Sequence, residues 1–155
     1  MKRLFATILL IAVSFTFGMA QAVEEEKEAI KKVIQTAYVE GLQNEGDAAK
    51  IDAGFHPGFD LLGIGKGDQI WKLPIYTWKE RALDDVKSGK KPKPAEETVT
   101  VNFLSVDVTG TAAVVKLEFL VGGKKTYVDY ISLYKFASGW KIVNKIFYKL
   151  PQDES

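Results

Sequence analysis

The sequence of 155 residues contains no cysteine, a single histidine (His56) and only two arginines, Arg3 and Arg81. Without cysteine the protein has no disulfides, no thiol nucleophile and no thiolate metal site, so apolar packing must hold the fold together. With one histidine, the ligands of any metal site would be almost wholly carboxylates, and we expect no metal. The scarcity of arginine leaves few groups for bidentate binding of phosphate.

An excess of charge of one sign is also missing. Lysine and arginine together number 21, aspartate and glutamate number 20, and the formal net charge is +1. This balance gives no electrostatic reason to bind nucleic acid or an anionic membrane surface. We therefore expect neither of these partners, and no cofactor.

The first 22 residues have the three parts of a secretory signal peptide. Two basic residues begin it, residues 4–17 are almost wholly apolar, and Ala20 and Ala22 are the small residues that a signal peptidase reads. The apolar run is shorter than the roughly 20 residues that a membrane-spanning helix needs, although an uncleaved anchor is the alternative. We expect cleavage after Ala22, a periplasmic or secreted protein, and one domain over residues 23–155 without a membrane segment.

Three helices are predicted in the first half of the domain. Apolar residues at spacings of three and four predict an amphipathic helix over 23–42. Asp47 is placed to cap a short helix over 48–53. The Thr-Trp-Lys-Glu at 77–80 has the spacing of a capping box, which predicts a third helix over 78–87.

Strands are predicted between and after these helices. Two short strands, 59–65 and 69–75, precede the third helix, and from residue 97 the apolar period changes to two. Glycine-containing tight turns then separate four long strands, so that neighbouring strands must be antiparallel; these strands are 98–108, 111–121, 125–136 and 140–150. The expected fold is α+β, with a curved antiparallel sheet wrapped around the three N-terminal helices and an apolar cavity between them.

Three stretches resemble the nuclear transport factor 2-like superfamily: "FHPGFDLLGI" after the second helix, "YVDYISLYKFASGWKIVNKIF" at the end, and the opening helix followed by "NEGDAAKI". They cover nearly all of residues 25–149. This superfamily includes ketosteroid isomerases, scytalone dehydratase, SnoaL-like cyclases and many binding domains, and the chain resembles its secreted bacterial branch labelled "putative lumazine-binding". The resemblance implies a cystatin-like cone but no single function, because this fold hosts enzymes, carriers and scaffolds.

The register of the last hairpin decides which polar side chains enter the cone. A three-residue turn at 137–139 places Ile131 opposite Lys145 and Asp129 opposite Phe147, on one apolar face. Asp129 and Lys145 are then diagonal neighbours. A two-residue turn would shift the pairing by one residue and weaken this interpretation.

Isomerases of the superfamily use an aspartate in an apolar cavity as a general base, because such burial destabilises the charged form of a carboxylate. The resemblance therefore implies that Asp129 is a proton carrier with Lys145 as its charge partner. The alternative is an ion pair at the rim of the sheet that only ties the strands together. Four aromatic residues are further candidates to line the cavity and bind a ligand, with core packing as the alternative; these are Tyr38, Trp71, Tyr76 and Trp78.

His56 also has two interpretations. An imidazole at the mouth of the cavity can act as the acid that complements Asp129 or bind the polar edge of a ligand. Alternatively, it follows the end of the second helix, where a ring N–H can bond to the last free carbonyls and help to stop the helix before Pro57.

Three functions are compatible with these features. The first is an exported domain that binds a small apolar or aromatic molecule in a pocket of about 300 Å³ or more. The second is a cofactor-independent isomerase or dehydratase with Asp129 as base and His56 or a tyrosine as acid. The third is a dimeric interaction module, because the outer sheet face is expected to carry Tyr130, Tyr134, Trp140 and Ile142 and would be covered by a second copy.

Overall fold

The computed structural model describes residues 21–151. One long helix covers residues 21–45, α-helical over 21–33 and wound as a π-helix in its second half, η1 (Ile34–Glu45). The other elements are α2 (Ala48–Gly54), β1 (Phe55–Ile64), η2 (Lys66–Asp68), β2 (Ile70–Pro74), α3 (Ile75–Lys87), η3 (Ala95–Glu97), β3 (Val99–Thr109), β4 (Ala112–Val121), β5 (Lys124–Phe136) and β6 (Gly139–Lys149). The expected signal peptide falls almost entirely outside the described residues. No helix within residues 21–151 is long and apolar enough to cross a bilayer.

The first two helices are the ones that the sequence predicts. In the first helix the buried side chains recur at the helical spacing, as in Ile30, Ile34 and Tyr38. The helix ends at Gly46, whose left-handed φ of 70° lets its N–H bond to the carbonyl of Gly41. Asp47 then caps α2, because its carboxylate accepts from the backbone N–H of Lys50 at 3.0 Å.

The third helix starts earlier than predicted. It begins at Ile75, directly after β2, and Pro74 occupies the N-cap position without a side-chain cap. Thr77 and Glu80 therefore lie inside α3, and the predicted capping box is wrong. Ile75 is buried in the core, and its packing starts the helix at that point.

The six strands form one sheet in the order β2-β1-β6-β5-β4-β3. The antiparallel meander β3-β4-β5-β6 is confirmed by the register of all three strand pairs. The pair β1–β6 is parallel, which makes the sheet mixed rather than wholly antiparallel. This parallel contact brings the strand that contains His56 beside the last strand of the chain.

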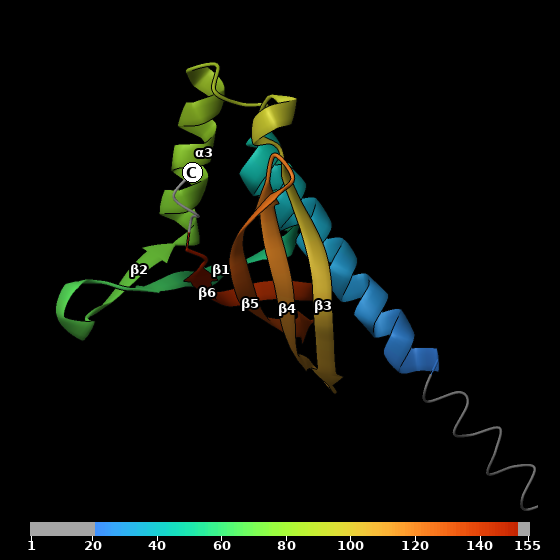
Figure 1. Cartoon of the computed structure of the whole chain (residues 1–155). Coiled ribbons are helices and arrows are strands. Elements are labelled where there is room, and N and C mark those ends of the chain that lie inside the picture. Colours follow the sequence, from blue (N-terminus) through green and yellow to red (C-terminus); the bar gives the residue numbers. More distant parts are fainter. Residues whose placement is uncertain (1–20, 152–155) are drawn as a thin grey trace, which may run out of the picture.

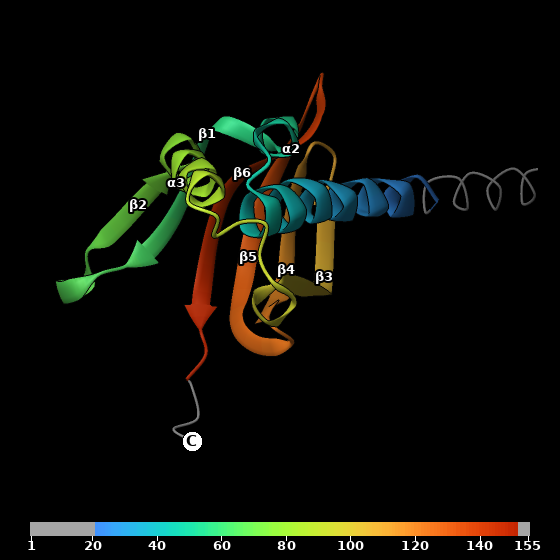
Figure 2. The same ribbon diagram turned by 90° about the horizontal axis from the view of Figure 1, so that it is seen from above.

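The sheet curves around the helices as expected for an α+β cone. Register shifts interrupt the ladders of β3–β4, β4–β5 and β5–β6, and such bulges bend a strand and increase its twist. The first helix runs along one side of the sheet (Figure 1), and from above it lies across β5, β4 and β3 with α2 and α3 beside its C-terminal end (Figure 2). The core fills the space between this concave face and the helices, and includes Ile34, Ile51, Leu117 and Ile131.

The last hairpin reaches the predicted register by a different route. Phe136 pairs with Gly139, so the turn has two residues rather than the predicted three. The shorter turn shifts the start of β6 by one residue, so Trp140 and Ile142, which were expected on the outer face, are buried in the core instead. A bulge at Val143, between the pairs Leu133–Ile142 and Ser132–Asn144, then adds one residue to β6. Beyond the bulge the pairs Ile131–Lys145 and Asp129–Phe147 are those predicted, because the extra residue offsets the shorter turn.

Candidate functional site

Asp129 and Lys145 form a buried ion pair inside the cone. Asp129 is 0% exposed and Lys145 is 6% exposed. The Lys145 Nζ lies 2.7 Å from Asp129 Oδ2. The predicted diagonal contact between these two residues is therefore present, and it lies in the interior rather than at the rim of the sheet.

Tyr38, on the long helix, completes the polar cluster. Its hydroxyl donates to Asp129 Oδ2 at 2.8 Å, across 91 positions of sequence, and accepts from Lys145 Nζ. Asp129 Oδ1 is buried and has no hydrogen-bond partner within residues 21–151. One carboxylate oxygen thus carries both donors, while the other is free of protein partners.

Aromatic rings surround the ammonium group of this cluster. The Lys145 Nζ lies 4.7 Å from the ring centroid of Tyr38, 5.5 Å from Phe119, 5.6 Å from Phe147 and 5.8 Å from Trp78. Contacts of this kind attract a cation to the ring faces and more strongly where water is excluded. They partly offset the loss of hydration of the buried lysine.

Burial sets the electrostatics of the cluster. It lowers the pKa of Lys145 below the ordinary lysine value, and the negative charge and hydrogen bond of Asp129 oppose this effect without cancelling it. Burial also raises the pKa of Tyr38 well above its usual range, and the charge of Asp129 adds to that rise. Tyr38 therefore remains a protonated donor throughout the physiological range.

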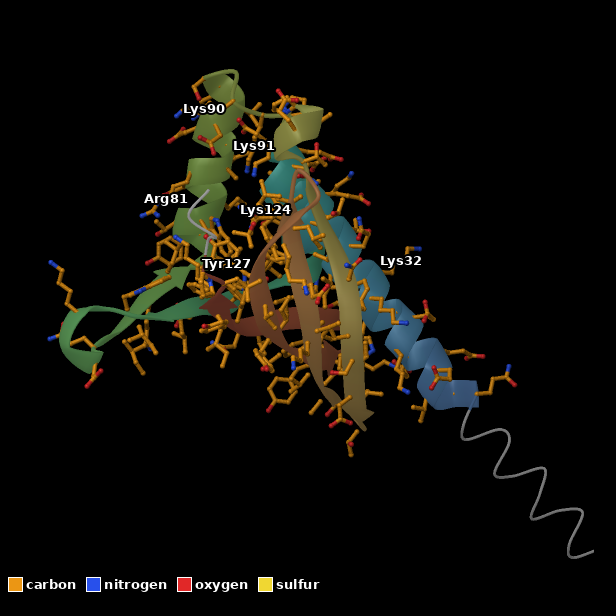
Figure 3. The ribbon with its side chains drawn as sticks, in the orientation of Figure 1. Lys32, Arg81, Lys90, Lys91, Lys124 and Tyr127 are labelled. Carbon is orange, nitrogen blue, oxygen red and sulfur yellow. The ribbon has the colours of Figure 1, made fainter. Side chains whose placement is uncertain are left out.

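A cavity of about 330 Å³ lies beside the cluster and is not fully enclosed. Its walls are mainly apolar and aromatic, formed by Tyr38, Leu61, Trp78, Phe119, Tyr127 and Phe147. Its polar lining comes from Gln43, Lys93 and Lys145. Figure 3 shows Tyr127 on the side of β5 that faces α3. Asp129 does not line this cavity, so the cluster presents its amine and its phenol to the space.

The structure separates the remaining predicted site residues from this cavity. Tyr76 is 62% exposed and lies with His56 in a second pocket of about 640 Å³, formed by α2, β1, α3 and the β5–β6 turn. Trp71 lies on β2 with its ring 6.1 Å from that of Phe147, and does not line the cavity of the cluster. Of the candidates, Tyr38, Trp78, Asp129 and Lys145 come together.

In the part of the chain that the structure describes, His56 bonds neither to Asp129 nor to the last carbonyls of α2, and it lines the second pocket instead. Its ring stacks on Phe136 with centroids 4.8 Å apart, and its Nδ1 accepts from the backbone N–H of Gly58 at 3.0 Å. Asp129 Oδ2 accepts from Tyr38 and Lys145 instead. The last carbonyls of α2 receive Lys141, whose Nζ donates to the Ala53 oxygen at 2.5 Å, so the expected helix-stopping bond from the imidazole is wrong.

Phe119, Tyr127 and Phe147 line the cavity and were not identified as site residues from the sequence. The signal was available, because side chains alternate between the faces of a strand. Tyr127 shares the face of Asp129, and Phe119 is paired with Tyr127 across β4 and β5. Phe147 lies opposite Asp129 in the hairpin register. Extending the alternation by one period of two residues on each strand would have identified all three.

A family model described as "Putative lumazine-binding" matches residues 25–148. The match includes all but the first four residues of the first helix and every later element except the last residue of β6. The chain belongs to this family. No curated protein matches the chain. Within residues 21–151, no group of three or more histidine, cysteine, aspartate or glutamate side chains is arranged to hold a metal ion.

This chain also shares its fold with solved nuclear transport factor 2-like (NTF2-like) structures. One is a NTF2-like protein of unknown function from Shewanella baltica, with 24% identity, a TM-score of 0.60, and coverage of 83% of this chain and 96% of that one. Another, from Silicibacter pomeroyi, has 20% identity, a TM-score of 0.65, and coverage of 83% and 98%. A domain with a cystatin-like fold from Nostoc punctiforme has 13% identity, a TM-score of 0.55, and coverage of 84% and 80%. At these identities the likeness establishes the fold alone.

Proposed function

We propose that this protein is an exported domain that binds a small, largely aromatic molecule in the cavity of its cone. The observation that carries the proposal is a cavity with aromatic walls and a polar end where Lys145 is already paired with Asp129. Small-molecule sites are mainly apolar with a few convergent polar groups. The family description, "Putative lumazine-binding", names a ligand of this kind, a planar bicyclic compound with carbonyl acceptors.

Lys145 favours a neutral ligand group that accepts a hydrogen bond. The charge of Lys145 is matched within the protein by Asp129, so an anionic group would compete with an existing partner 2.7 Å away. An ammonium has three N–H donors, of which Asp129 and Tyr38 accept two, so one is left for a ligand. A carbonyl oxygen directed at Lys145, with its ring among Trp78, Phe119 and Phe147, fits this arrangement.

The same geometry favours binding over catalysis by Asp129. A general base must come within hydrogen-bond reach of the proton that it removes. Asp129 is wholly buried, does not line the cavity, and already holds two donors on Oδ2. We therefore prefer the carrier function to the isomerase or dehydratase alternative.

The first test is native mass spectrometry of the protein isolated from the cells that produce it. We expect a polypeptide that begins at Val23, because the start of the chain has the pattern of a cleaved signal peptide. We also expect a retained small molecule that dissociates on denaturation. A chain that retains residues 1–22 would contradict the export proposal.

Lumazine provides a direct binding assay through quenching of its fluorescence. Trp78→Ala removes one wall of the cavity, and we expect the affinity to fall about tenfold or more, equal to about 1.4 kcal/mol. The matched control is Tyr76→Ala on the same helix, which removes an exposed ring outside this cavity and leaves the affinity unchanged. Equal losses in the two variants would contradict the assignment of the cavity.

We further propose that the outer face of the sheet joins two copies of the chain. Tyr130 and Ile146 are paired across β5 and β6 on this face, and they are 39% and 50% exposed. Tyr134 and Val114 extend the patch with 53% and 47% exposure. A contiguous apolar patch on a sheet is typical of a protein interface.

Sedimentation at micromolar concentration tests this interface. We expect a dimer for the wild-type protein and a monomer for Ile146→Lys, because a charge in the centre of the patch would be buried without a partner. Tyr76→Lys, on an exposed part of α3, should remain dimeric. A monomeric wild-type protein would overturn the proposal.

A further inference from the structure

Lys145 is the one amine of the cavity that is both buried and surrounded by rings. Its side chain is 8% exposed, and four aromatic centroids lie within 5.8 Å of its Nζ. Most other described lysines lie at the surface, several of them in ion pairs with exposed carboxylates, for example Lys87 with Asp84. An amine at the end of an aromatic cavity can act as a nucleophile as well as a hydrogen-bond donor to a ligand.

We propose that Lys145 is a carbonyl-reactive lysine, whose ε-amine forms an imine with an aromatic aldehyde or ketone held in the cavity of the cone. This inference rests on the proposed binding function, because the same aromatic walls must hold the ring of the carbonyl compound. It adds a covalent step to a site to which the family description assigns only binding.

The surroundings of Lys145 favour the neutral amine, which is the nucleophile. A lysine is activated for imine formation when it is desolvated in a hydrophobic pocket. Here burial lowers the pKa of Lys145, and only one carboxylate opposes that effect. The neutral fraction at neutral pH is therefore larger than for a lysine at the surface.

Asp129 is placed to exchange protons with the amine. Its Oδ2 lies 2.7 Å from Lys145 Nζ, and its Oδ1 has no partner within residues 21–151. The carboxylate can take the third proton of the ammonium without leaving its place in the sheet. Tyr38 donates to the same Oδ2 and holds the carboxylate in position.

The step balances without an oxidant, a reductant or a metal. The nitrogen lone pair of Lys145 forms a bond to the carbonyl carbon while the carbonyl π bond breaks, and the oxygen takes one proton from the nitrogen. The carbon–oxygen bond of this carbinolamine then breaks, and the oxygen leaves as water with the second proton of the neutral amine. A carbon–nitrogen double bond remains, and the walls of the cavity protect it from hydrolysis.

The pH dependence of the reaction identifies the amine. The titratable groups that face Lys145 are Tyr38 from η1, Asp129 and Tyr127 from β5, and Lys93 from the loop before η3, whereas α3 contributes the uncharged Trp78. The rate of imine formation should rise as pH increases through the lowered pKa of Lys145. Asp129→Asn removes the charge that raises this pKa, so the rise should move to lower pH.

Reductive trapping with 2-naphthaldehyde and sodium cyanoborohydride tests the proposal. We expect one naphthylmethyl group per chain, located at Lys145 by peptide mapping, at a rate at least tenfold above that of any other lysine. Lys145→Arg keeps the positive charge and removes the reactive amine, and it should abolish the fast phase. Lys87→Met removes an exposed amine outside the cavity and should leave labelling at Lys145 unchanged.

The carbonyl-free analogue 2-naphthalenemethanol separates this inference from the proposed function. If the alcohol binds and protects Lys145 of the wild-type protein from trapping, the result supports both the binding function and the reactive lysine. This measurement does not depend on the folding of any variant. Binding of the alcohol without preferential trapping at Lys145 overturns the imine and leaves the binding function standing. If the alcohol does not bind and Lys145 is not trapped preferentially, both the binding function and the imine are overturned.

Discussion

Replacing Lys145 by methionine lowers the free energy of unfolding by about 3–5 kcal/mol, because it leaves the carboxylate of Asp129 buried without its cation. Asp129 is wholly buried, and Tyr38 would then be its only donor within the described residues. Urea unfolding with linear extrapolation measures this loss of stability in the Lys145→Met variant.

The double variant Asp129→Leu, Lys145→Met removes both charges. It separates the destabilisation caused by an unpaired buried charge from the contribution of the intact ion pair to the free energy of unfolding. Replacement of a whole buried ion pair by apolar residues is often neutral or stabilising. We expect the double variant to unfold within about 2 kcal/mol of the wild type. Lys72→Met is the matched surface control, because Lys72 is an exposed partner of Asp60 at 3.8 Å and should change stability by less than about 1 kcal/mol. If Lys145→Met loses no more than this control, the ion pair is hydrated in solution.

Gly122→Ala should destabilise the protein by about 3–4 kcal/mol, through two effects that add. Gly122 has a φ of +56°, where a residue with a side chain is strained. A Cβ at this position would also lie 2.1 Å from the carbonyl oxygen of Glu96, so η3 would have to move. That contact belongs to a junction in which the N–H of Gly122 donates to the Thr98 oxygen at 3.0 Å.

Gly110→Ala measures the first effect alone. Gly110 occupies the β3–β4 turn with a φ of +58°, and a Cβ there would meet nothing within 4 Å. Its cost should be about 1–2 kcal/mol, the strain of one left-handed residue. Thermal unfolding of both variants gives the difference of about 2 kcal/mol that belongs to the close approach to Glu96. Equal costs would show that η3 moves aside freely.

The elements of this fold follow closely from local pattern. Helical spacing predicted the first helix, the cap at Asp47 predicted the second, and alternation with glycine turns predicted the four long strands. The predictions were wrong where contacts between elements distant in sequence determine the structure. Burial of Ile75 starts α3 three residues before the predicted position, and the parallel contact of β1 with β6 depends on a long-range pairing that leaves no local mark.

The candidate site was only partly predictable. The alternation of side chains placed Asp129 and Lys145 on one face, and their contact followed from a register that the structure reaches through a bulge at Val143. Two compensating errors, the length of the turn and the missing bulge, left the inner pairs correct. His56 was a candidate because it is chemically distinctive, but its stacking on Phe136 assigns it to another pocket.

By itself the sequence determined which chemical groups are present and the order of helices and strands, because these depend on residue type and on periods of two and 3.6. It also determined the inward face of the four long strands except at the start of β6, where Trp140 and Ile142 are buried. Only the tertiary structure decided which polar groups meet. Tyr38 reaches Asp129 across 91 positions because the long helix crosses the concave face of the curved sheet (Figure 2). That crossing depends on bulges and on packing of the whole core, and it turns a predicted ion pair between two strands into a buried amine, phenol and carboxylate beside an aromatic cavity.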